Sequence, residues 1–492
     1  MMPKSQKLPF SFAKRYGVLI TTIEDTFATI THRNHPDLSI LNELRRHINL
    51  PIKLEKVDDE TFGKLLVKSY ETDSSIAMQM AEDFGDSMDL FDLMHELPKP
   101  EDLLEKQDDA PIIRLLNALL SEAIKEGASD VHIETFEDRV TVRFRVDGIL
   151  RDILEPQRVL APLIVSRIKI MAKLDIAEKR LPQDGRITLR IAGRAVDVRV
   201  STMPTSHGER VVLRLLDKQT ARLDLAQLGM DPNSLRLMQK LITVPHGIIL
   251  VTGPTGSGKT TTLYAAMTSL NNNTRNILTV EDPIEFDLPG IGQTQVNYKV
   301  EMTFAKGLRA ILRQDPDVVM VGEIRDVDTA QIAIQASLTG HLVLSTLHTN
   351  SAIGAITRLD DMGIEPFLLS SSLLGVLAQR LMRLLCKECK KPMPATASEC
   401  DLLSVPSHPA PTIYHPTGCK HCRYSGFSGR SGVYELIAID EKLRALIHDR
   451  KSEQDIKKYA RTLFPSIRQD GYRRVLAGDT SLEEILRVTS EE

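Results

Sequence analysis

A glycine-rich segment in the second half of the chain has residue types and spacing suited to binding phosphate. It follows four apolar, β-favouring residues, Ile248 to Val251, and a helix is predicted to begin near Lys259. The segment consists of Gly253, Pro254, Thr255, Gly256, Ser257, Gly258, Lys259, Thr260 and Thr261. Its glycines let backbone N–H groups point toward phosphate oxygens, Lys259 adds a positive charge, and the Thr260 hydroxyl is suited to ligate Mg²⁺. Because a chance glycine-rich turn would lack this strand-then-helix context, the segment predicts a site for a nucleoside triphosphate with Mg²⁺.

A carboxylate that follows a buried strand is the first candidate for hydrolytic chemistry. Hydrolysis of a bound triphosphate needs an oriented water molecule and a base that takes its proton. Val318 to Val321 reads as a buried strand, and Gly322 stands where many phosphate-loop proteins have an aspartate that supports the metal. Glu323 comes next. We therefore predict Glu323 as the general base and expect water molecules to supply more of the metal support.

A second group of acids follows another predicted strand, Asn276 to Val280. Glu281, Asp282 and Glu285 come directly after it. Because the carboxyl ends of parallel strands share one edge of a sheet, these acids are expected near Glu323. Glu281 and Glu285 are therefore alternative bases, whereas Asp282 is either part of the active site or a turn cap before a proline.

Histidines and arginines flank the same strands. His341 and His348 bracket the predicted strand Leu342 to Thr346. An imidazole there can sense a γ-phosphate by donating a hydrogen bond, although a structural role is the alternative. The arginines around the Glu323 strand are Arg309, Arg313 and Arg325. They are predicted to clamp phosphate from the same chain or across a subunit boundary.

The region before the phosphate loop is unusually rich in arginine. The arginines on or beside its predicted strands are Arg186, Arg190, Arg194, Arg199, Arg210 and Arg214. For any one of them, the simpler explanation is a position on the wet face of a half-buried sheet. As a group beside a nucleotide-binding domain they are candidates for contacting phosphate, because the planar guanidinium suits phosphate better than an ammonium does.

Most of the cysteines occur in two Cys-x-x-Cys pairs. The paired residues are Cys386, Cys389, Cys419 and Cys422. They predict a structural zinc site with four thiolate ligands, although the spacer over residues 390–418 is longer than usual. Redox use of one pair, or His421 in place of one thiolate, is the alternative. Cys400 is left without a predicted role.

The composition limits the class of protein. The chain has 492 residues, 26% of them charged, with a net charge of −4 and no Trp. These values are typical of globular domains, and they offer neither a basic surface nor an aromatic platform for nucleic acid. No apolar run is long enough to span a bilayer, and Lys4 and Lys7 are not followed by the apolar core of a secretory signal. We therefore expect a cytoplasmic protein that reaches a membrane only through partners.

Breaks in the pattern predict several domains. They are a small α/β domain over residues 1–95, an acidic linker over 96–108, a mixed α/β middle domain over 109–217, a linker over 218–231, and a phosphate-loop domain over 232–492 that includes a zinc subdomain over 384–425. The phosphate-loop domain alternates apolar strands with helical patterns, which predicts a parallel sheet covered by helices on both faces. The first domain carries no recognisable chemistry, so docking to a partner is its expected role.

Taken in order, these motifs resemble those of the secretion-superfamily ATPases. Within that group the chain is most similar to the assembly ATPases of the type II secretion system, known as general secretion pathway protein E. The matching segments are residues 8–13, 109–113, 127–134, 177–186, 253–264, 280–285, 313–317, 322–326, 338–341 and 345–350, together with both cysteine pairs. The resemblance therefore covers the chain from its beginning nearly to residue 492.

The resemblance implies an α/β fold with a RecA-like ATPase domain, a PAS-like middle domain and a zinc-binding tetracysteine subdomain. It implies a homo-hexamer that uses ATP, Mg²⁺ and Zn²⁺ to drive pseudopilus assembly and protein export. Its N-terminal domain would bind the cytoplasmic part of an inner-membrane secretion protein, and an inner-membrane platform protein would be a further partner. By motif, Arg199 and Arg214 would reach phosphate, His341 and His348 would form a histidine box, and Glu323 would be the catalytic carboxylate.

Other functions fit part of the pattern. An ATPase of type IV pilus extension or DNA uptake shares every catalytic motif, although the start over residues 8–13 and the short N-terminal domain favour secretion. A nucleic-acid translocase is disfavoured by the acidic net charge and by the lack of a basic patch interleaved with aromatic residues. A small-molecule kinase would need neither an arginine-rich accessory domain nor a zinc module. We therefore predict a secretion ATPase.

Overall fold

The computed structural model of this protein describes two compact units, Met1–Asp217 and Lys218–Glu492. The described residues are 8, 16–23, 26–33, 36–37, 40–41, 44–45, 48, 50–58, 61–62, 65, 110–191, 194–217, 224–272 and 274–490. The acidic linker predicted over 96–108, and residues 218–223 of the second predicted linker, lie outside them. The finer division of each unit into domains therefore stays a prediction.

The first part of unit 1 contains a small three-stranded sheet in its described residues. Its strands are β1 (Val18–Ile23), β2 (Ala28–His32) and β3 (Ile52–Lys56). β1 and β2 pair antiparallel, while β2 and β3 pair parallel. Val18, Ile20 and Ile30 are buried in one apolar core with Leu44. The apolar spacing of residues 37–46 and 59–70 predicts two helices in the same domain, and the described residues cover these segments only in part.

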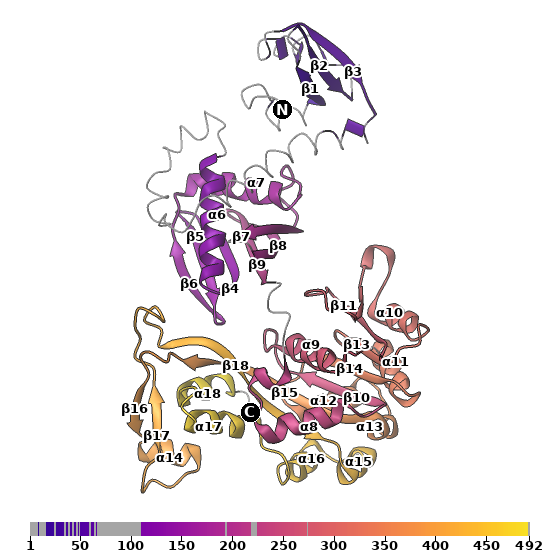
Figure 1. Ribbon diagram of the computed structural model, residues 1–492, viewed down its shortest axis with the longest axis vertical. Coiled ribbons are helices and arrows are strands. Elements are labelled where there is room, and N and C mark those ends of the chain that lie inside the picture. The colour runs from indigo at the N-terminus through magenta and orange to yellow at the C-terminus, as the bar shows by residue number, and fades with distance from the viewer. Residues whose placement is uncertain are drawn as a thin grey trace. The chain divides into compact units, whose positions relative to one another are not determined.

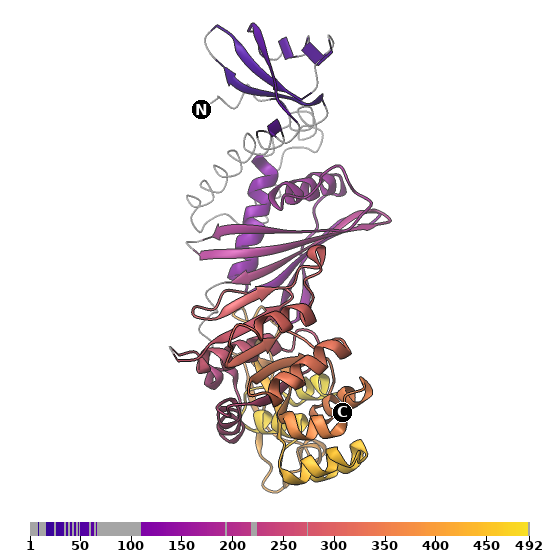
Figure 2. The same ribbon diagram turned by 90° about the vertical axis from the view of Figure 1, so that its right-hand side faces the viewer.

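The second part of unit 1 is a sheet with helices on one face (Figures 1 and 2). Its strands, in the order in which they lie side by side, are β6 (Ile149–Leu154), β5 (Val140–Val146), β4 (Ala128–Thr135), β9 (Gly208–Asp217), β8 (Arg194–Thr205) and β7 (Gln183–Ile191). All neighbouring strands are antiparallel. The covering helices are α6 (Ala110–Lys125) and α7 (Ala161–Met171), with η2 (Arg158–Leu160) before α7.

This sheet has one apolar and one polar face because strand side chains alternate. On β8, Val196, Val198 and Val200 belong to the apolar core under α6 and α7. α6 buries Leu115 and Leu119 against that core at helical spacing. The arginines and acids discussed below occupy the other face.

Unit 2 is built on a seven-stranded sheet in its described residues. The strands lie in the order β12 (Gly292–Gln295), β11 (Ile277–Glu281), β13 (Val318–Val321), β14 (Leu342–Leu347), β10 (Gly247–Thr252), β15 (Leu373–Leu385) and β18 (Phe427–Ala438). In this order, neighbouring strands from β12 to β15 are parallel, and β18 is antiparallel to β15. The parallel sheet expected from four apolar runs is therefore present, extended by β12, β15 and β18.

Helices cover both faces of this sheet, as predicted. They are η4 (Leu225–Leu228), α8 (Pro232–Ile242), α9 (Lys259–Leu270), α10 (Phe304–Ile311), α11 (Val327–Leu338), α12 (Ala352–Asp361), α13 (Pro366–Ser372), α15 (Glu441–His448) and α16 (Glu453–Ala460). The short η5 (Tyr298–Val300) has no buried residue. α9 packs on one face with Leu263 and Met267, and α12 packs on the other with Ile353 and Ile356. Two separate apolar layers therefore hold the central strand β10 from both sides.

The end of β15 leads into a small C-terminal module beside the sheet (Figure 1). Its elements are β16 (Lys391–Pro394), α14 (Ala397–Leu403), β17 (Thr412–His415), α17 (Ile467–Leu476) and α18 (Leu482–Val488). β16 and β17 form a hairpin, and Met382 and Val433 of the two long strands pack in the same core as Ile485. The long strands β15 and β18 thus join this module to the nucleotide-binding sheet.

Candidate functional site

The glycine-rich loop has a backbone conformation that depends on its glycines. It follows β10, whose six residues are all buried, and it leads directly into α9. Gly253, Gly256 and Gly258 have φ values of +148°, +79° and +87°, which side chains rarely adopt. A Cβ on Gly253 would also clash with the carbonyl oxygen of Gln379. The glycines are therefore needed for both backbone conformation and close packing.

Lys259 lies at the start of α9 with its ammonium turned into the loop. Nζ donates to the carbonyl oxygens of Gly253 at 2.8 Å and of Pro254 at 3.1 Å. Burial lowers the pKa of Lys259 to about 8; the Glu323 carboxylate opposes this shift and the Arg380 guanidinium adds to it. An ammonium this poorly hydrated gains more from a phosphate partner than an exposed one would. The half-buried Thr260 and Thr261 follow in the first turn of the helix.

Glu323 is the carboxylate that the structure brings to this loop. It lies just after β13, with its side chain 13% exposed, 2.5 Å from Arg325 Nη2 and 3.4 Å from His348 Nε2. The hydroxyl of Thr346 donates to the carbonyl of Gly322 at 2.7 Å, so β14 fixes the turn that carries Glu323. Glu323, Arg325 and His348 therefore lie at the same sheet edge as Lys259.

The loop after β14 is tied directly to β10. Thr252 Oγ1, on the last residue of β10, accepts from the backbone N–H of Thr349 at 2.9 Å and lies 2.7 Å from Thr349 Oγ1. Sequence reasoning did not single out either threonine. A hydroxyl at the last position of an apolar strand was the available signal.

The three acids at and beyond the end of β11 have different environments. Glu281 is 3% exposed, and its carboxylate accepts from Tyr264 Oη, from Thr279 Oγ1 at 2.6 Å and from Gln293 Nε2 at 3.0 Å. Burial raises the pKa of Tyr264, which stays protonated and donates. Both carboxylate oxygens of Glu281 therefore already accept hydrogen bonds from the protein.

Asp282 and Glu285 lie in the segment that follows. Asp282 is exposed and accepts from Tyr298 Oη at 2.9 Å. It precedes Pro283 through a cis peptide bond. The backbone N–H of Glu285 donates to Tyr264 Oη at 3.3 Å, so one tyrosine holds both ends of this acidic turn.

The structure does not bring His341 to the nucleotide edge of its own chain. His341 precedes β14, and its carbonyl oxygen accepts from the backbone N–H of Gly247 at the start of β10. Its Nδ1 lies 2.9 Å from the carbonyl oxygen of Ala336. A strand of this length separates its two ends by about 20 Å, so only His348 of the two histidines flanks the site. The expectation that both flank it overlooked that a strand has two opposite ends.

Arg309 and Arg313 also lie away from Lys259. α10 begins beside Gly322 and runs back toward the amino-terminal edge of the sheet, where Asn276 bonds to the carbonyl of Gln314. Arg309 and Arg313 are exposed at the far end of this helix. Of the three predicted arginine clamps, Arg325 alone contacts a site residue in its own chain, as far as the described residues show.

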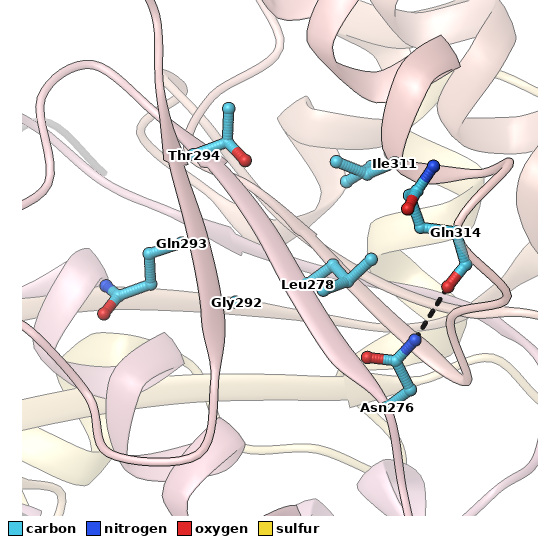
Figure 3. Close-up of a pocket in the computed structure, with 7 residues that line it drawn as sticks. All are labelled: Asn276, Leu278, Gly292, Gln293, Thr294, Ile311 and Gln314. Carbon is cyan, nitrogen blue, oxygen red and sulfur yellow. Dashed lines mark hydrogen bonds between the residues drawn. The ribbon is translucent and has the colours of Figure 1, made fainter.

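The same far edge carries a hollow of about 390 Å³ between β12 and the end of α10 (Figure 3). It is lined by Asn276, Leu278, Gly292, Gln293, Thr294, Ile311 and Gln314. None of these residues belongs to the phosphate loop. This hollow is therefore separate from the candidate nucleotide site.

The arginines of unit 1 form an ordered row. Pairing places Arg186, Arg199 and Arg214 opposite one another on β7, β8 and β9, and Arg214 opposite Asp130 on β4. Arg214 Nε donates to Asp130 Oδ1 at 2.8 Å, and Arg186 pairs with Asp197. Although burial opposes ionisation, the hydrogen bonds from Arg214 and Ser129 lower the pKa of Asp130. Carboxylates therefore hold Arg186 and Arg214 in place.

Two members of the row differ in exposure. The Arg214 side chain is 57% exposed despite its ion pair, and Arg199 is half-buried. Arg210 forms a similar pair with Glu134 at 2.5 Å. The side chains of Arg190 and Arg194 lie outside the described part of the chain.

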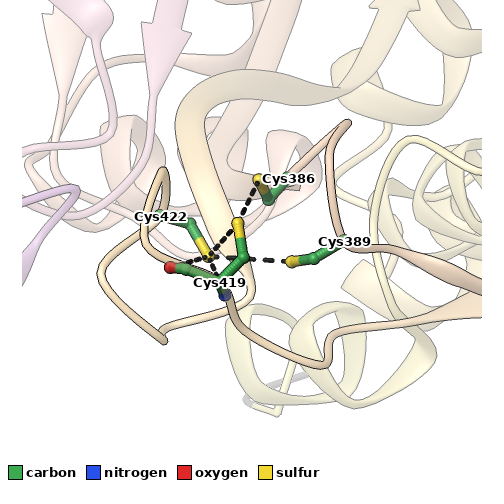
Figure 4. A group of neighbouring side chains, drawn as sticks. All are labelled: Cys386, Cys389, Cys419 and Cys422. Atoms are coloured by element: carbon green, nitrogen blue, oxygen red, sulfur yellow. Dashed lines mark hydrogen bonds between the residues drawn. The ribbon is translucent and has the colours of Figure 1, made fainter.

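The paired cysteines converge as predicted (Figure 4). The four Sγ atoms lie within 4.8 Å of one another, with Cys386–Cys419 at 3.9 Å and Cys389–Cys422 at 3.7 Å. A tetrahedral zinc site with Zn–S bonds of about 2.3 Å requires Sγ separations of about 3.8 Å. The four residues therefore fit zinc, and none of them is in a disulfide.

Backbone N–H groups complete the cysteine cluster. Those of Cys419 and Gly426 each donate to Cys422 Sγ at 3.2 Å. Burial opposes ionisation, but these bonds lower the pKa of Cys422 to about 6, which favours a thiolate ligand. Cys400 is buried in a neighbouring apolar core and takes no part in the cluster.

Comparison with known sequences identifies the family. The family described as type II/IV secretion system protein matches residues 105–487. The chain belongs to this family. A second family, described as a domain of GSPII protein E, matches residues 7–70.

Individual relatives agree with this assignment. The type II secretion system protein E of Pseudomonas aeruginosa is 62% identical over 487 residues, covering 99% of this chain and 97% of that protein. The type II secretion system ATPase E of Vibrio cholerae is 60% identical over 488 residues, with the same coverage. The predicted resemblance to the secretion ATPases is therefore confirmed, and the chain is an ATPase of this family.

Solved structures confirm the fold. The crystal structure of the pilus retraction motor PilT with bound ADP matches with a TM-score of 0.52 at 28% identity, covering 76% of this chain and 96% of that one. The predicted RecA-like architecture with a mixed α/β middle domain agrees with this family. Among the described residues, no helix has the length and apolar character needed to cross a membrane.

The low pKa of Lys259 predicts that nucleotide binding weakens in alkali. Phosphate favours the ammonium form, so the affinity of the free protein for ATP should fall as pH rises through about 8. The apparent Kd of Mg-ATP, measured by calorimetry, should rise by up to about tenfold per pH unit between about pH 8 and 9.5. In the matched variant Lys259→Arg, whose guanidinium stays charged, the Kd should hardly change with pH. A flat profile in the wild type would contradict this prediction.

The cysteine geometry predicts a metal-dependent C-terminal module. Cys386→Ser should remove the bound zinc, measured by elemental analysis, and lower the free energy of unfolding of unit 2 by more than about 4 kcal/mol, as expected for loss of a structural metal. Cys400→Ser is the matched control, because Cys400 lies outside the cluster; it should retain about one zinc per chain. A wild-type protein that is stable without metal would contradict the zinc assignment.

Proposed function

We propose that this protein hydrolyses ATP to drive pseudopilus assembly and protein export by a type II secretion system. The observation that carries the proposal is the convergence of Lys259, Glu323, Arg325 and His348 at one sheet edge, in a chain similar over nearly its whole length to type II secretion ATPases.

Each catalytic residue has a role that follows from its position. The loop amides and Lys259 bind the β- and γ-phosphates, and the Thr260 hydroxyl would hold Mg²⁺ when the ion is bound. Bound Mg²⁺ supplies positive charge that neutralises the transferring phosphoryl group. Glu323 accepts the proton of the attacking water. Arg325 and His348 hold its carboxylate in place through the contacts at 2.5 and 3.4 Å.

The hydrogen bonding of the neighbouring acids supports Glu323 as the base. The oxygens of Glu281 already accept three hydrogen bonds, so its role is to hold Tyr264 and the acidic turn. Asp282 bonds to an exposed tyrosine and positions that turn. Glu285, in the same turn, is the remaining alternative base.

Some predicted site residues lie away from Lys259 of their own chain. Such residues can instead act on the nucleotide site of a neighbouring chain. We assign Arg309, Arg313 and His341 to a subunit boundary within a homo-hexamer, because all three lie toward the opposite edge of the sheet from the phosphate loop. Arg199 and Arg214 reach phosphate when the middle domain closes over the nucleotide. Partly exposed guanidinium groups in a row held by carboxylates are suited to this task.

The N-terminal part of the chain is proposed to connect the motor to the membrane. The match of residues 7–70 to a domain of GSPII protein E supports docking of residues 1–95 on the cytoplasmic domain of an inner-membrane secretion protein. Residues 96–108 and 218–223 act as linkers, whereas Leu225 and Met230 of the second predicted linker are buried in the core of unit 2. The domain over 232–492, with its zinc subdomain over 384–425, acts on the platform protein. The chain works in the cytoplasm at the inner membrane and reaches the membrane through these partners.

One alternative keeps the same chemistry. The likeness to the pilus retraction motor PilT supports a pilus ATPase, including one for pilus extension or DNA uptake, as the second candidate. A nucleic-acid translocase is disfavoured by the net charge of −4.

Glu323→Gln should separate binding from hydrolysis. The amide is the same size but cannot take the water proton, so kcat should fall about 10²- to 10⁴-fold while the Kd of Mg-ATP changes little. Steady-state ATPase assays and calorimetry measure the two quantities. Glu301→Gln, an exposed glutamate paired only with Lys306 among its recorded contacts, is the control and should behave as wild type. If Glu285→Gln loses kcat and Glu323→Gln does not, the base is Glu285.

The proposed function predicts that turnover depends on assembly and on the membrane partner. The ATPase rate per chain should rise at least about tenfold, with concentration or on adding the partner's cytoplasmic domain, because arginines from neighbouring chains complete each site. The ATPase rate is measured together with the molecular mass of the assembly. A separate series of assays adds single-stranded DNA. Stimulation by DNA alone would reject the secretion role in favour of a translocase.

A further inference from the structure

A side chain of the neighbouring strand β15 forms a hydrogen bond with the phosphate loop. Gln379 is 1% exposed and lies directly beneath the loop. Its Nε2 donates to the carbonyl oxygen of Ser257 at 2.6 Å, and its Oε1 accepts from Thr262 Oγ1 at 2.8 Å. One amide therefore bonds both the loop and the first turn of α9.

The backbone around Gln379 adds further constraints on the loop. A Cβ on Gly253 would clash with the Gln379 carbonyl oxygen, and a Cβ on Gly258 would lie 3.2 Å from its Nε2. The same carbonyl accepts from Arg380 Nη1 at 3.2 Å, while Arg380 Nη2 donates to the carbonyl of Asn350 at 3.0 Å. Successive residues of β15 thus contact the phosphate loop and the loop that follows His348.

We propose that Gln379 is a positioning residue for ATP: its side-chain amide fixes the phosphate loop in the conformation that directs backbone N–H groups at the phosphates. The inference rests on the proposed nucleotide site. A buried amide with both ends bonded is costly to rearrange, because breaking either bond leaves a buried polar group unpaired. Gln379 touches no phosphate in this arrangement, so it acts through Ser257 and Thr262.

The position of Gln379 explains why an amide, and not an apolar residue, occurs within the apolar strand β15. Its neighbours Leu377 and Val376 are buried in apolar cores, where a glutamine without partners would be unfavourable. Among the residues that the structure describes, no backbone N–H donates to the carbonyl of Ser257. Glutamine supplies the donor for that carbonyl and the acceptor for Thr262 with a single side chain.

The test compares nucleotide affinity with stability in variants of the full chain. Gln379→Met keeps the volume but removes both hydrogen bonds; it should raise the Kd of Mg-ATP at least tenfold and increase hydrogen exchange of the loop amides. Thr262→Val removes only the second bond and should weaken binding less. The double variant should bind less weakly than the sum of the two single effects, because Thr262 and Gln379 share one hydrogen bond. Gln335→Met, on the exposed face of α11, is the matched control and should bind as wild type.

The increase in Tm that Mg-ATP causes distinguishes a positioning residue from a purely structural one. A structural residue would lower the Tm equally with and without Mg-ATP, whereas loss of a positioning residue should shrink the Tm increase that Mg-ATP causes. Wild-type affinity in folded Gln379→Met would overturn the inference. If that variant does not fold, Gln379→Asn, which retracts the amide by one methylene, decides in the same way. If the wild type itself does not bind ATP, the proposed function fails instead.

Discussion

The candidate site depends on one constraint: β10, β11, β13 and β14 are parallel, so their carboxyl ends meet at one edge of the sheet. Each strand then contributes the residue that follows it. β10 leads into the loop with Lys259, β13 into Glu323 and β14 into His348. The hydroxyl groups of Thr252 and Thr346 tie these ends together across the strands. Residues at the amino ends of the same strands, such as His341, are excluded from the site by the same geometry.

Charge is organised in the same way in both units. In unit 2 a half-buried ammonium and a guanidinium both interact with a mostly buried carboxylate, so each charge is partly compensated. In unit 1 the arginine row is held by acids on neighbouring strands. A group held in this way loses little side-chain entropy when phosphate arrives, which is the condition for electrostatic stabilisation of a transition state.

Much of this arrangement could be predicted from the sequence because its signals are local. The glycine spacing, the apolar run before it and the cysteine pairs each identify a feature whose parts are close in the chain, and the structure contains all of them. The long strand β15 was not predicted, since its apolar residues also fit helical spacing and only pairing with β10 and β18 decides the matter. For the same reason the contacts of Gln379 and the separation of His341 from Lys259 could not be predicted, because both depend on pairing between distant segments.

The pairing of β10 with β15 also has a consequence for how the protein is made. Thr252 of β10 pairs with Ala378 of β15. The ribosome must therefore add every residue between them before β10 can pair with β15. Until then the apolar strand β10 presents unpaired backbone groups along one edge, a surface prone to pair with other chains. We infer that biogenesis of this motor is most vulnerable to aggregation while the nascent chain ends between α9 and β15.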